Sequence, residues 1–199
     1  IPSYKLEKDV IDAEIDVIRA LGAEIRCGVE VGKDVTIEQL KKEGYQAFYI
    51  AIGCQGGRLP GVPGDKAEGT DFAVHFLNEA LSNPNQKYDG DVIVVGGGNV
   101  AIDCARTAHR FHPDSVSMFC LESRETMPAT VSEIAEAEEE DIKVNPGWGP
   151  KEVLTDENGH VTGILFKRCL STIDPETKAF SPKYDENETI EVHADRIIF

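Results

Sequence analysis

The chain has 199 residues, of which 20 are basic and 36 are acidic, so its formal net charge is -16. This length allows one large domain or two small ones with a substantial core. A hydrophobic fraction of 41% and a charged fraction of 28% are typical of a globular protein rather than a disordered one. The negative charge argues against nucleic-acid and acidic-membrane partners, although backbone amides can still bind a nucleotide.

The five cysteines are scattered and form no C-x-x-C pair. This spacing argues against zinc-ribbon and thioredoxin-type chemistry and is typical of a reducing compartment. The sequence contains no apolar run of about 18 residues and no signal peptide, so we expect a cytoplasmic protein. Because the chain lacks an initiator Met and stops within the apolar run 197–199, we expect a fragment of a longer protein.

The first quarter of the chain alternates between helical and extended patterns. The glycine- and proline-rich stretch that follows, 53–69, indicates a loop or hinge. The expected elements before it are a helix over 9–21, a strand over 23–31, a short helix from a capping box at 36–39 to about residue 43, and a buried strand over 45–52.

The remainder begins with alternating strands and helices and ends in hairpins. The expected elements are a helix over 71–81, a strand over 91–95, a helix from the next glycines to about residue 110, a strand over 115–121, a helix over 130–140 and a strand over 142–145. After these we expect a hairpin around the turn 156–159, a strand over 161–170, a loop over 171–188, and closing strands over 189–193 and 194–199.

A glycine-rich turn joins the strand 91–95 to the helix after it, in the pattern G-x-G-x-x-A. Gly96 would allow the tight turn, Gly98 would let the backbone approach a pyrophosphate, and the small Ala101 would let helix and strand pack closely. The helix N-terminus would direct its amides at the phosphates. The order strand, glycine turn, helix, strand therefore predicts a dinucleotide-binding domain.

The acid that such a domain uses for the adenosine ribose is Glu122, at the end of the second strand. A carboxylate there would repel a 2′-phosphate and favour NAD over NADP. A solvated glutamate in a polar loop is the alternative interpretation. Arg124 could reach a 2′-phosphate or stack on adenine, and a surface salt bridge is the alternative for this residue.

No other constellation predicts chemistry. The sequence has no P-loop lysine, no G-x-S-x-G turn and no histidine pair at metal-binding spacing. Tyr4 and Lys8 have the Y-x-x-x-K spacing of short-chain dehydrogenases, but they precede the glycine turn. We therefore predict neither a catalytic side chain nor a metal site, so that any chemistry belongs to cofactors.

Five stretches match one known family in the same order along the chain: residues 1–6, 31–35, 51–53, 96–103 and 123–129. On these stretches the sequence resembles the NAD(P)H-dependent small subunit of glutamate synthase and its relatives, in the pyridine nucleotide-disulfide oxidoreductase superfamily. Members of this group lack a redox disulfide. Cys54 has no second cysteine nearby in the sequence and is interpreted as structural.

The resemblance implies an α/β fold, with a Rossmann-like NAD(P)-binding domain and a β-meander inserted in a partial FAD-binding domain. Residues 1–55 would belong to the FAD-binding domain, 56–193 would form the NAD(P)H-binding domain, and 194–199 would be the strand that returns to the FAD-binding domain. The family passes a hydride from nicotinamide to FAD, and electrons onward to iron–sulfur clusters and a partner subunit. FAD is expected in the full-length protein and not in this fragment, which is expected to be inactive alone.

Residues of the glycine turn and its surroundings would bind the cofactor. Relatives that use NADPH carry two arginines at the positions of Leu121 and Glu122, so we expect this chain to prefer NAD(H). The expected cofactor-binding residues are Gly53, Gly96, Gly97, Gly98, Asn99, Val100, Ala101, Glu122 and Arg124. A non-catalytic NAD-binding regulatory module and a self-contained dehydrogenase are the alternatives; the latter lacks a His, Tyr or Lys in a usual catalytic place.

Overall fold

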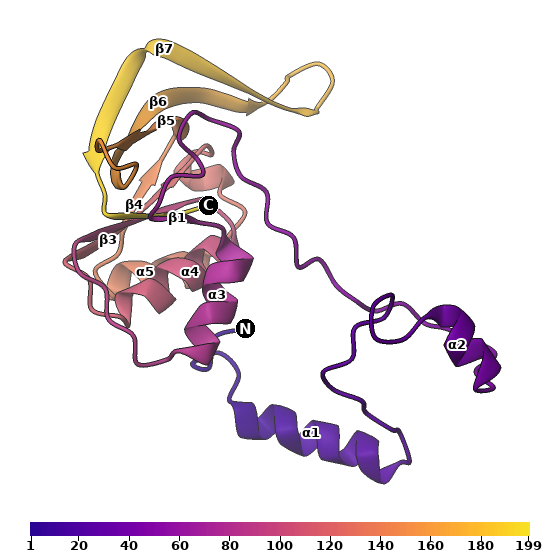
Figure 1. Ribbon diagram of the computed structural model, residues 1–199. Helices are drawn as coiled ribbons and strands as arrows, with labels where there is room; N and C mark the ends of the chain where they lie inside the picture. Colours follow the sequence, from indigo (N-terminus) through magenta and orange to yellow (C-terminus); the bar gives the residue numbers. More distant parts are fainter. The chain divides into compact units, whose positions relative to one another are not determined.

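The computed structural model describes residues 1–199 in full, and the chain divides into two compact units (Figure 1). The larger unit comprises Ile1–Pro2 and Gly56–Phe199, and the smaller unit comprises Ser3–Gln55. None of the helices combines the length and the apolar character needed to cross a membrane.

A five-stranded parallel sheet in the order β1-β8-β2-β3-β4 forms the centre of the larger unit. Its central strand β2 is apolar after its first residue, Asp91, because both faces of the sheet are covered. The strands are β1 (Thr70–Asp71), β2 (Asp91–Val95), β3 (Ser115–Cys120), β4 (Lys143–Pro146) and β8 (Arg196–Ile198).

Three helices cover one face of this sheet (Figure 1): α3 (Ala73–Ser82), α4 (Asn99–His109) and α5 (Val131–Glu139). They begin and end within two residues of the expected bounds. Thr130 caps α5 by accepting a hydrogen bond from the backbone amide of Glu133 at 3.4 Å. The buried side chains between helices and sheet include Phe76, Ile102, Met118 and Ile134.

An antiparallel sheet of β5 (Trp148–Thr155), β6 (Val161–Ile173) and β7 (Phe180–His193) covers the other face. The rings of Phe119 and Phe166 stack between the two sheets, with centroids 4.3 Å apart and an interplanar angle of 14°. Ile93, Ile164 and Ile197 are buried beside them. The larger unit thus has three layers: helices, parallel sheet and meander.

Strand β5 begins at Trp148, which pairs with Arg168 of β6. Strands β6 and β7 continue beyond this pair without β5 beside them. Beyond it the two strands form a two-stranded arm over residues 169–184, with apolar side chains exposed at Leu170, Ile173 and Phe180. The loop expected over 171–188 is therefore confirmed only for residues 174–179, and the rest of that range is strand. Both faces of the arm are largely exposed, so its side chains show no apolar alternation, and register shifts interrupt the pairing further.

The last strand also differs from expectation. Residues 194–199 were assigned to the FAD-binding domain, whereas β8 pairs with β1 and β2 of the larger unit's own sheet. Ile197 and Ile198 are buried there, at 0% and 2% exposure. Burial on both faces of the parallel sheet accounts for the apolar run at this end of the chain.

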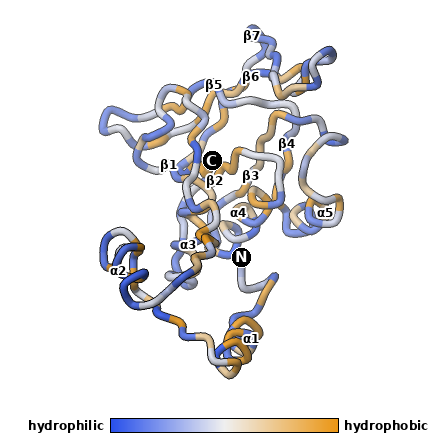
Figure 2. Tube along the Cα trace, turned by 90° about the vertical axis from the view of Figure 1, so that its right-hand side faces the viewer, coloured by the Kyte–Doolittle hydropathy of each residue, from blue (hydrophilic) through white to orange (hydrophobic).

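The smaller unit contains α1 (Lys8–Ala20) and α2 (Ile37–Lys42), and the predicted capping box of Thr36 and Gln39 is confirmed. The strands expected over 23–31 and 45–52 are wrong, because neither segment finds a neighbouring strand and only the bridge Val31–Val35 forms. Figure 2 shows apolar residues along this unit. The helix α1 buries no residue, and Tyr49, Ile50 and Ile52 are exposed.

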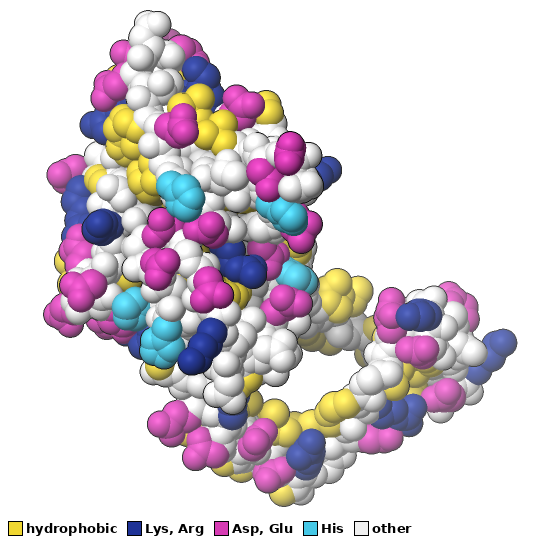
Figure 3. Space-filling model, turned by 60° about the vertical axis from the view of Figure 1, so that its left-hand side comes forward, with side chains coloured by type: hydrophobic (Ala, Val, Ile, Leu, Met, Phe, Trp, Pro, Cys, Tyr) yellow, Lys and Arg dark blue, Asp and Glu magenta, His cyan; other side chains and the backbone are white.

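Acidic side chains are spread over the face shown in Figure 3. One acid, Glu140, takes part in a partly buried ion-pair network between α4 and α5. Glu140 accepts hydrogen bonds from Arg106 at 2.7 Å and from Arg110 at 2.8 Å, and Arg106 also binds Glu136. Partial burial alone would raise the pKa of Glu140, but the two guanidinium groups outweigh it and lower this pKa to about 2. The network holds α5 against α4.

We predict that Glu140→Gln lowers the free energy of unfolding by about 2–3 kcal/mol at pH 7. The pKa of Glu140 in the folded chain lies below its ordinary value of 4.5. Its stabilisation is therefore complete above that value and is lost as the pH falls toward 2. Denaturant titrations at several pH values measure the difference in the free energy of unfolding between the native chain and this variant. This difference should disappear below about pH 4. The exposed neighbour Glu139→Gln is the control, and a gap independent of pH would contradict the prediction.

Candidate functional site

The glycine turn lies at the carboxyl end of β2, where the strand order diverges: β3 lies on one side of β2 and β8 on the other. Such a position is where open α/β sheets bind ligands. Gly96 has a φ of +154°, and its amide donates to the carbonyl of Phe119 at 2.8 Å. A Cβ placed on Gly96 would lie 3.1 Å from the Cβ of Ala101. The small residues at these two positions thus allow α4 to start close to the strand end.

The other two glycines of the turn have different surroundings. A Cβ on Gly97 would lie 2.9 Å from Oε2 of Glu122 and 3.0 Å from the Cβ of Cys120, so this glycine packs against the end of β3. A Cβ on Gly98, by contrast, would meet no atom within 4 Å. The space beside Gly98, at the first residue before α4, is therefore open to a ligand.

The start of α4 is tied to the loop before α5. The side-chain oxygen of Asn99 accepts a hydrogen bond from the amide of Thr130 at 3.0 Å, and the carbonyl of Gly97 accepts one from Ala129 at 3.0 Å. Val100 remains half-exposed. Asn99 thus has a structural partner, while Val100 offers an apolar surface next to the turn.

Glu122 lies two residues after the end of β3, and its carbonyl accepts a hydrogen bond from the amide of Gly147 at 2.7 Å. Its carboxylate lies beside Gly97, as noted above. The neighbouring thiol of Cys120 is buried, and burial together with the Glu122 charge raises its pKa to about 11. This thiol is therefore protonated near neutral pH. All five cysteines are free.

A cavity of about 230 Å³ opens at the glycine turn. Its walls come from the ends of β2, β3 and β8, from β5, and from the segment that precedes β1. The lining residues are Arg58, Pro60, Val95, Gly96, Gly97, Cys120, Leu121, Glu122, Trp148, Pro150 and Phe199. We call this the turn cavity.

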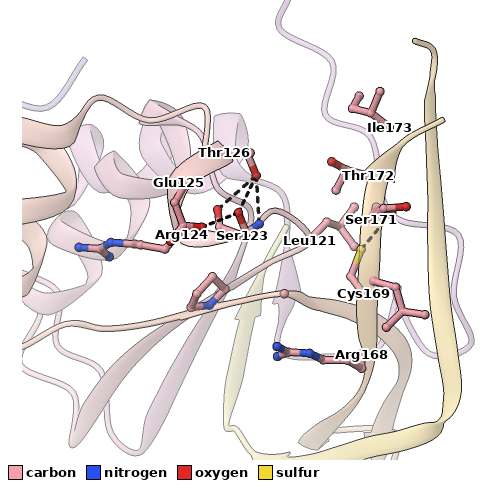
Figure 4. A pocket seen from close by; sticks show the side chains of 13 residues that line it. Leu121, Ser123, Arg124, Glu125, Thr126, Arg168, Cys169, Ser171, Thr172 and Ile173 are labelled. Atoms are coloured by element: carbon pink, nitrogen blue, oxygen red, sulfur yellow. Dashed lines mark hydrogen bonds between the residues drawn. The ribbon is translucent and has the colours of Figure 1, made fainter. Parts of the chain in front are cut away.

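A second cavity of about 600 Å³ shares Leu121 with the turn cavity and lies between the loop after β3 and the β6 strand (Figure 4). The loop contributes residues 123–126, which include the 3-10 helix η1 (Arg124–Thr126), and β6 contributes residues 168–173. We call this the arm cavity. The two cavities adjoin along the carboxyl ends of β2 and β3, which is the course a bound dinucleotide follows in this fold.

Two arginines line the arm cavity. Arg124 makes an ion pair with Glu138 of α5 at 2.6 Å, and its side chain points away from β6 (Figure 4). Arg168 lies over the ring of Trp148, with 5.1 Å between guanidinium and ring centroid. Sequence analysis missed Arg168 because only the pairing of β5 with β6 brings it to this place. For Arg124 the structure thus contains the surface ion pair that was the alternative interpretation of this residue.

All the expected site residues except Gly53 therefore lie at the glycine turn or along the two cavities. Gly96, Gly97 and Glu122 line the turn cavity, Gly98, Asn99, Val100 and Ala101 continue the same turn into α4, and Arg124 lines the arm cavity. Gly53 belongs to the smaller unit, has a φ of +65° and lines neither cavity.

A parallel sheet with a glycine turn at its switch point, covered by helices on one face and a meander on the other, has the architecture of the Rossmann class, to which many dinucleotide-binding domains belong. The sequence profile of pyridine nucleotide-disulphide oxidoreductases matches residues 7–179. The chain therefore belongs to the pyridine nucleotide-disulphide oxidoreductase family, as its resemblance predicted.

Named relatives agree with this family. The chain is 38% identical over 175 residues to the NADP(+)-dependent formate dehydrogenase subunit beta of Moorella thermoacetica, covering 84% of this chain and 24% of that protein. It is 34% identical over 178 residues to the glutamate synthase [NADPH] small chain of Halomonas elongata, covering 84% of this chain and 37% of that one. The chain thus spans about a quarter to two fifths of the length of these relatives.

The fold is shared with FprA from Mycobacterium tuberculosis in complex with NADPH. The TM-score is 0.69 at 17% identity, and the match covers 85% of this chain and 52% of that one. At this identity the likeness concerns the fold alone.

We predict that Ala101→Leu lowers the free energy of unfolding by about 1–3 kcal/mol, because the larger side chain has no room beside Gly96. Relief of the clash requires α4 to move away from the strand end, so nucleotide binding should weaken as well. Thermal and chemical denaturation measure the first effect. The control is Ala135→Leu at an exposed position of α5, and equal stability of the two variants would contradict the close packing.

Proposed function

We propose that the larger unit is the NAD(P)H-binding domain of a flavin-dependent oxidoreductase. The observation that carries the proposal is the open space beside Gly98, at the start of α4, with Glu122 at the end of the neighbouring strand and against Gly97. The turn leaves the first amides of α4 available to a pyrophosphate. Glu122 would accept hydrogen bonds from the adenosine ribose.

The residues present fit a dinucleotide along the two cavities. The pyrophosphate would lie beside Gly98, the adenosine toward Leu121 and the arm cavity, and the nicotinamide toward Phe199. A bound reduced nicotinamide supplies a hydride. The chain itself binds and orients it: Ala101 fixes the helix start, and Val100 offers an apolar contact beside the turn.

We infer that the smaller unit needs further sequence to bind a flavin. It carries no glycine fingerprint, and its apolar segments around Tyr49 and Ile52 are exposed. We propose that residues 3–55 belong to an FAD-binding domain that further sequence of a longer protein completes, and that Gly53 contacts the cofactors only there. The fraction of the relatives' length that this chain spans supports the proposal.

The proposed electron path continues from the flavin to iron–sulfur clusters or a large partner subunit. The relatives' names describe subunits of larger enzymes, which supports a partner of this kind. A test is to express the full reading frame that contains this chain. We expect a flavin absorbance that NADH bleaches, whereas a protein that binds NADH without any flavin would favour a non-catalytic regulatory module.

We further propose that the cofactor is NAD(H) rather than NADP(H). The two named relatives carry NADP in their names, but the carboxylate of Glu122 lies against the turn, where it would repel a 2′-phosphate. Arg168 lies on the far wall of the arm cavity, and Arg124 is paired with Glu138. The charge that follows the end of β3, where the ribose would lie, is therefore negative.

This preference is testable by titrating the chain with NADH and NADPH. We expect NADH to bind at least about tenfold more tightly, and Glu122→Arg to reverse the order by exchanging a repulsive charge for a guanidinium. Glu157→Arg, at the exposed β5–β6 turn, makes the same charge change away from both cavities. Equal or tighter binding of NADPH to the native chain would contradict the preference.

A further inference from the structure

Arg58 lines the turn cavity and is its only basic residue, while Glu122 is its only acidic one. It comes from the segment that leads into the larger unit, far from the glycine turn in sequence. Its guanidinium makes no ion pair or hydrogen bond. The chain has 36 acidic residues, yet none of them pairs with this arginine of the cavity wall.

The other arginines of the chain all have a partner. Those partners are an acid or an aromatic ring: Asp16 for Arg19, Glu24 for Arg26, Glu140 for Arg106 and Arg110, Glu138 for Arg124, Trp148 for Arg168 and Tyr88 for Arg196. Arg58 alone is left with its five donors available.

The backbone around Arg58 is anchored on both sides. A Cβ on the preceding Gly57 would lie 1.9 Å from the ring of Phe72, so that ring lies directly on the backbone of residue 57. On the other side, the amide of Gly61 donates to buried Asp65 at 2.8 Å. The carbonyl of Pro63 accepts from Val153 of β5 at 2.9 Å. The arginine is thus presented to the cavity from a fixed stretch of backbone.

The charges expected at the turn cavity favour a cation on its wall. A dinucleotide brings two negative phosphates beside Gly98, and Glu122 adds a third negative charge nearby. The start of α4 supplies only partial positive charge. A guanidinium suits phosphate oxygens because its donors form a planar fork.

We propose that Arg58 binds the pyrophosphate of the nicotinamide dinucleotide, so that the segment entering the larger unit contributes to the site together with the glycine turn. The inference rests on the proposed function and adds to it a binding residue outside the glycine fingerprint. The proposal specifies that Arg58 contacts the pyrophosphate and not the adenosine or the nicotinamide.

The test compares ligands with and without a pyrophosphate. Calorimetric or fluorescence titrations with NADH, ADP-ribose and adenosine are made on the native chain, Arg58→Gln and Arg58→Lys. We expect Arg58→Gln to weaken NADH and ADP-ribose about tenfold and to leave adenosine within twofold. Arg58→Lys should lie between, because it keeps the charge and loses the fork. Lys183→Gln, on β7 and outside both cavities, controls for net charge.

The outcomes separate the two proposals. If the native chain binds NADH and Arg58→Gln binds NADH and ADP-ribose as tightly, the role of Arg58 is overturned and the proposed function stands. An equal loss for adenosine also overturns it, because Arg58 would then act on the site as a whole. If the native chain binds no dinucleotide, both proposals fail. Circular dichroism of each variant verifies that the chain is folded.

Discussion

The close approach of α4 to the end of β2 determines the geometry of the site. Ala101 lies against Gly96, so the helix begins as soon as the strand ends and its first amides open onto the space beside Gly98. The amide of Gly96 donates to Phe119, whose ring stacks on Phe166 of the second sheet. Turn, parallel sheet and meander are therefore connected through two residues.

The β-α-β region of the fold was predictable from sequence because its signals are local. The apolar strand 91–95, the glycines after it and the helical stripe that follows each define their own element. The segments 23–31 and 45–52 show the limit of such signals. Their composition is that of strands, but a strand forms only where a neighbour pairs with it, and pairing is a property of the folded chain. The same holds for 194–199, whose place between β1 and β2 no local pattern specifies.

The candidate site divides in a similar way. Gly96, Gly98, Ala101 and Glu122 belong to one continuous motif, and the sequence therefore placed them together. Arg58 and Arg168 reach the cavities from other segments: the first through the contact of Gly57 with Phe72, the second through the pairing of β6 with β5. A single arginine in a loop or strand has no sequence pattern around it that distinguishes a ligand-binding residue from a surface charge.

Because one wall of the arm cavity belongs to the two-stranded arm of β6 and β7, this cavity should unfold locally more easily than the turn cavity. The glycine turn follows a strand of a sheet covered on both faces, so the hydrogen-bonded amides of that strand should exchange with solvent only in near-global unfolding. Residues 169–173 form a wall of the arm cavity but belong to a ladder with a single neighbouring strand and interrupted register. This wall can open by sub-global unfolding while the turn remains intact. A ligand spanning both cavities would then be held firmly at its phosphates and would order the far wall as it binds.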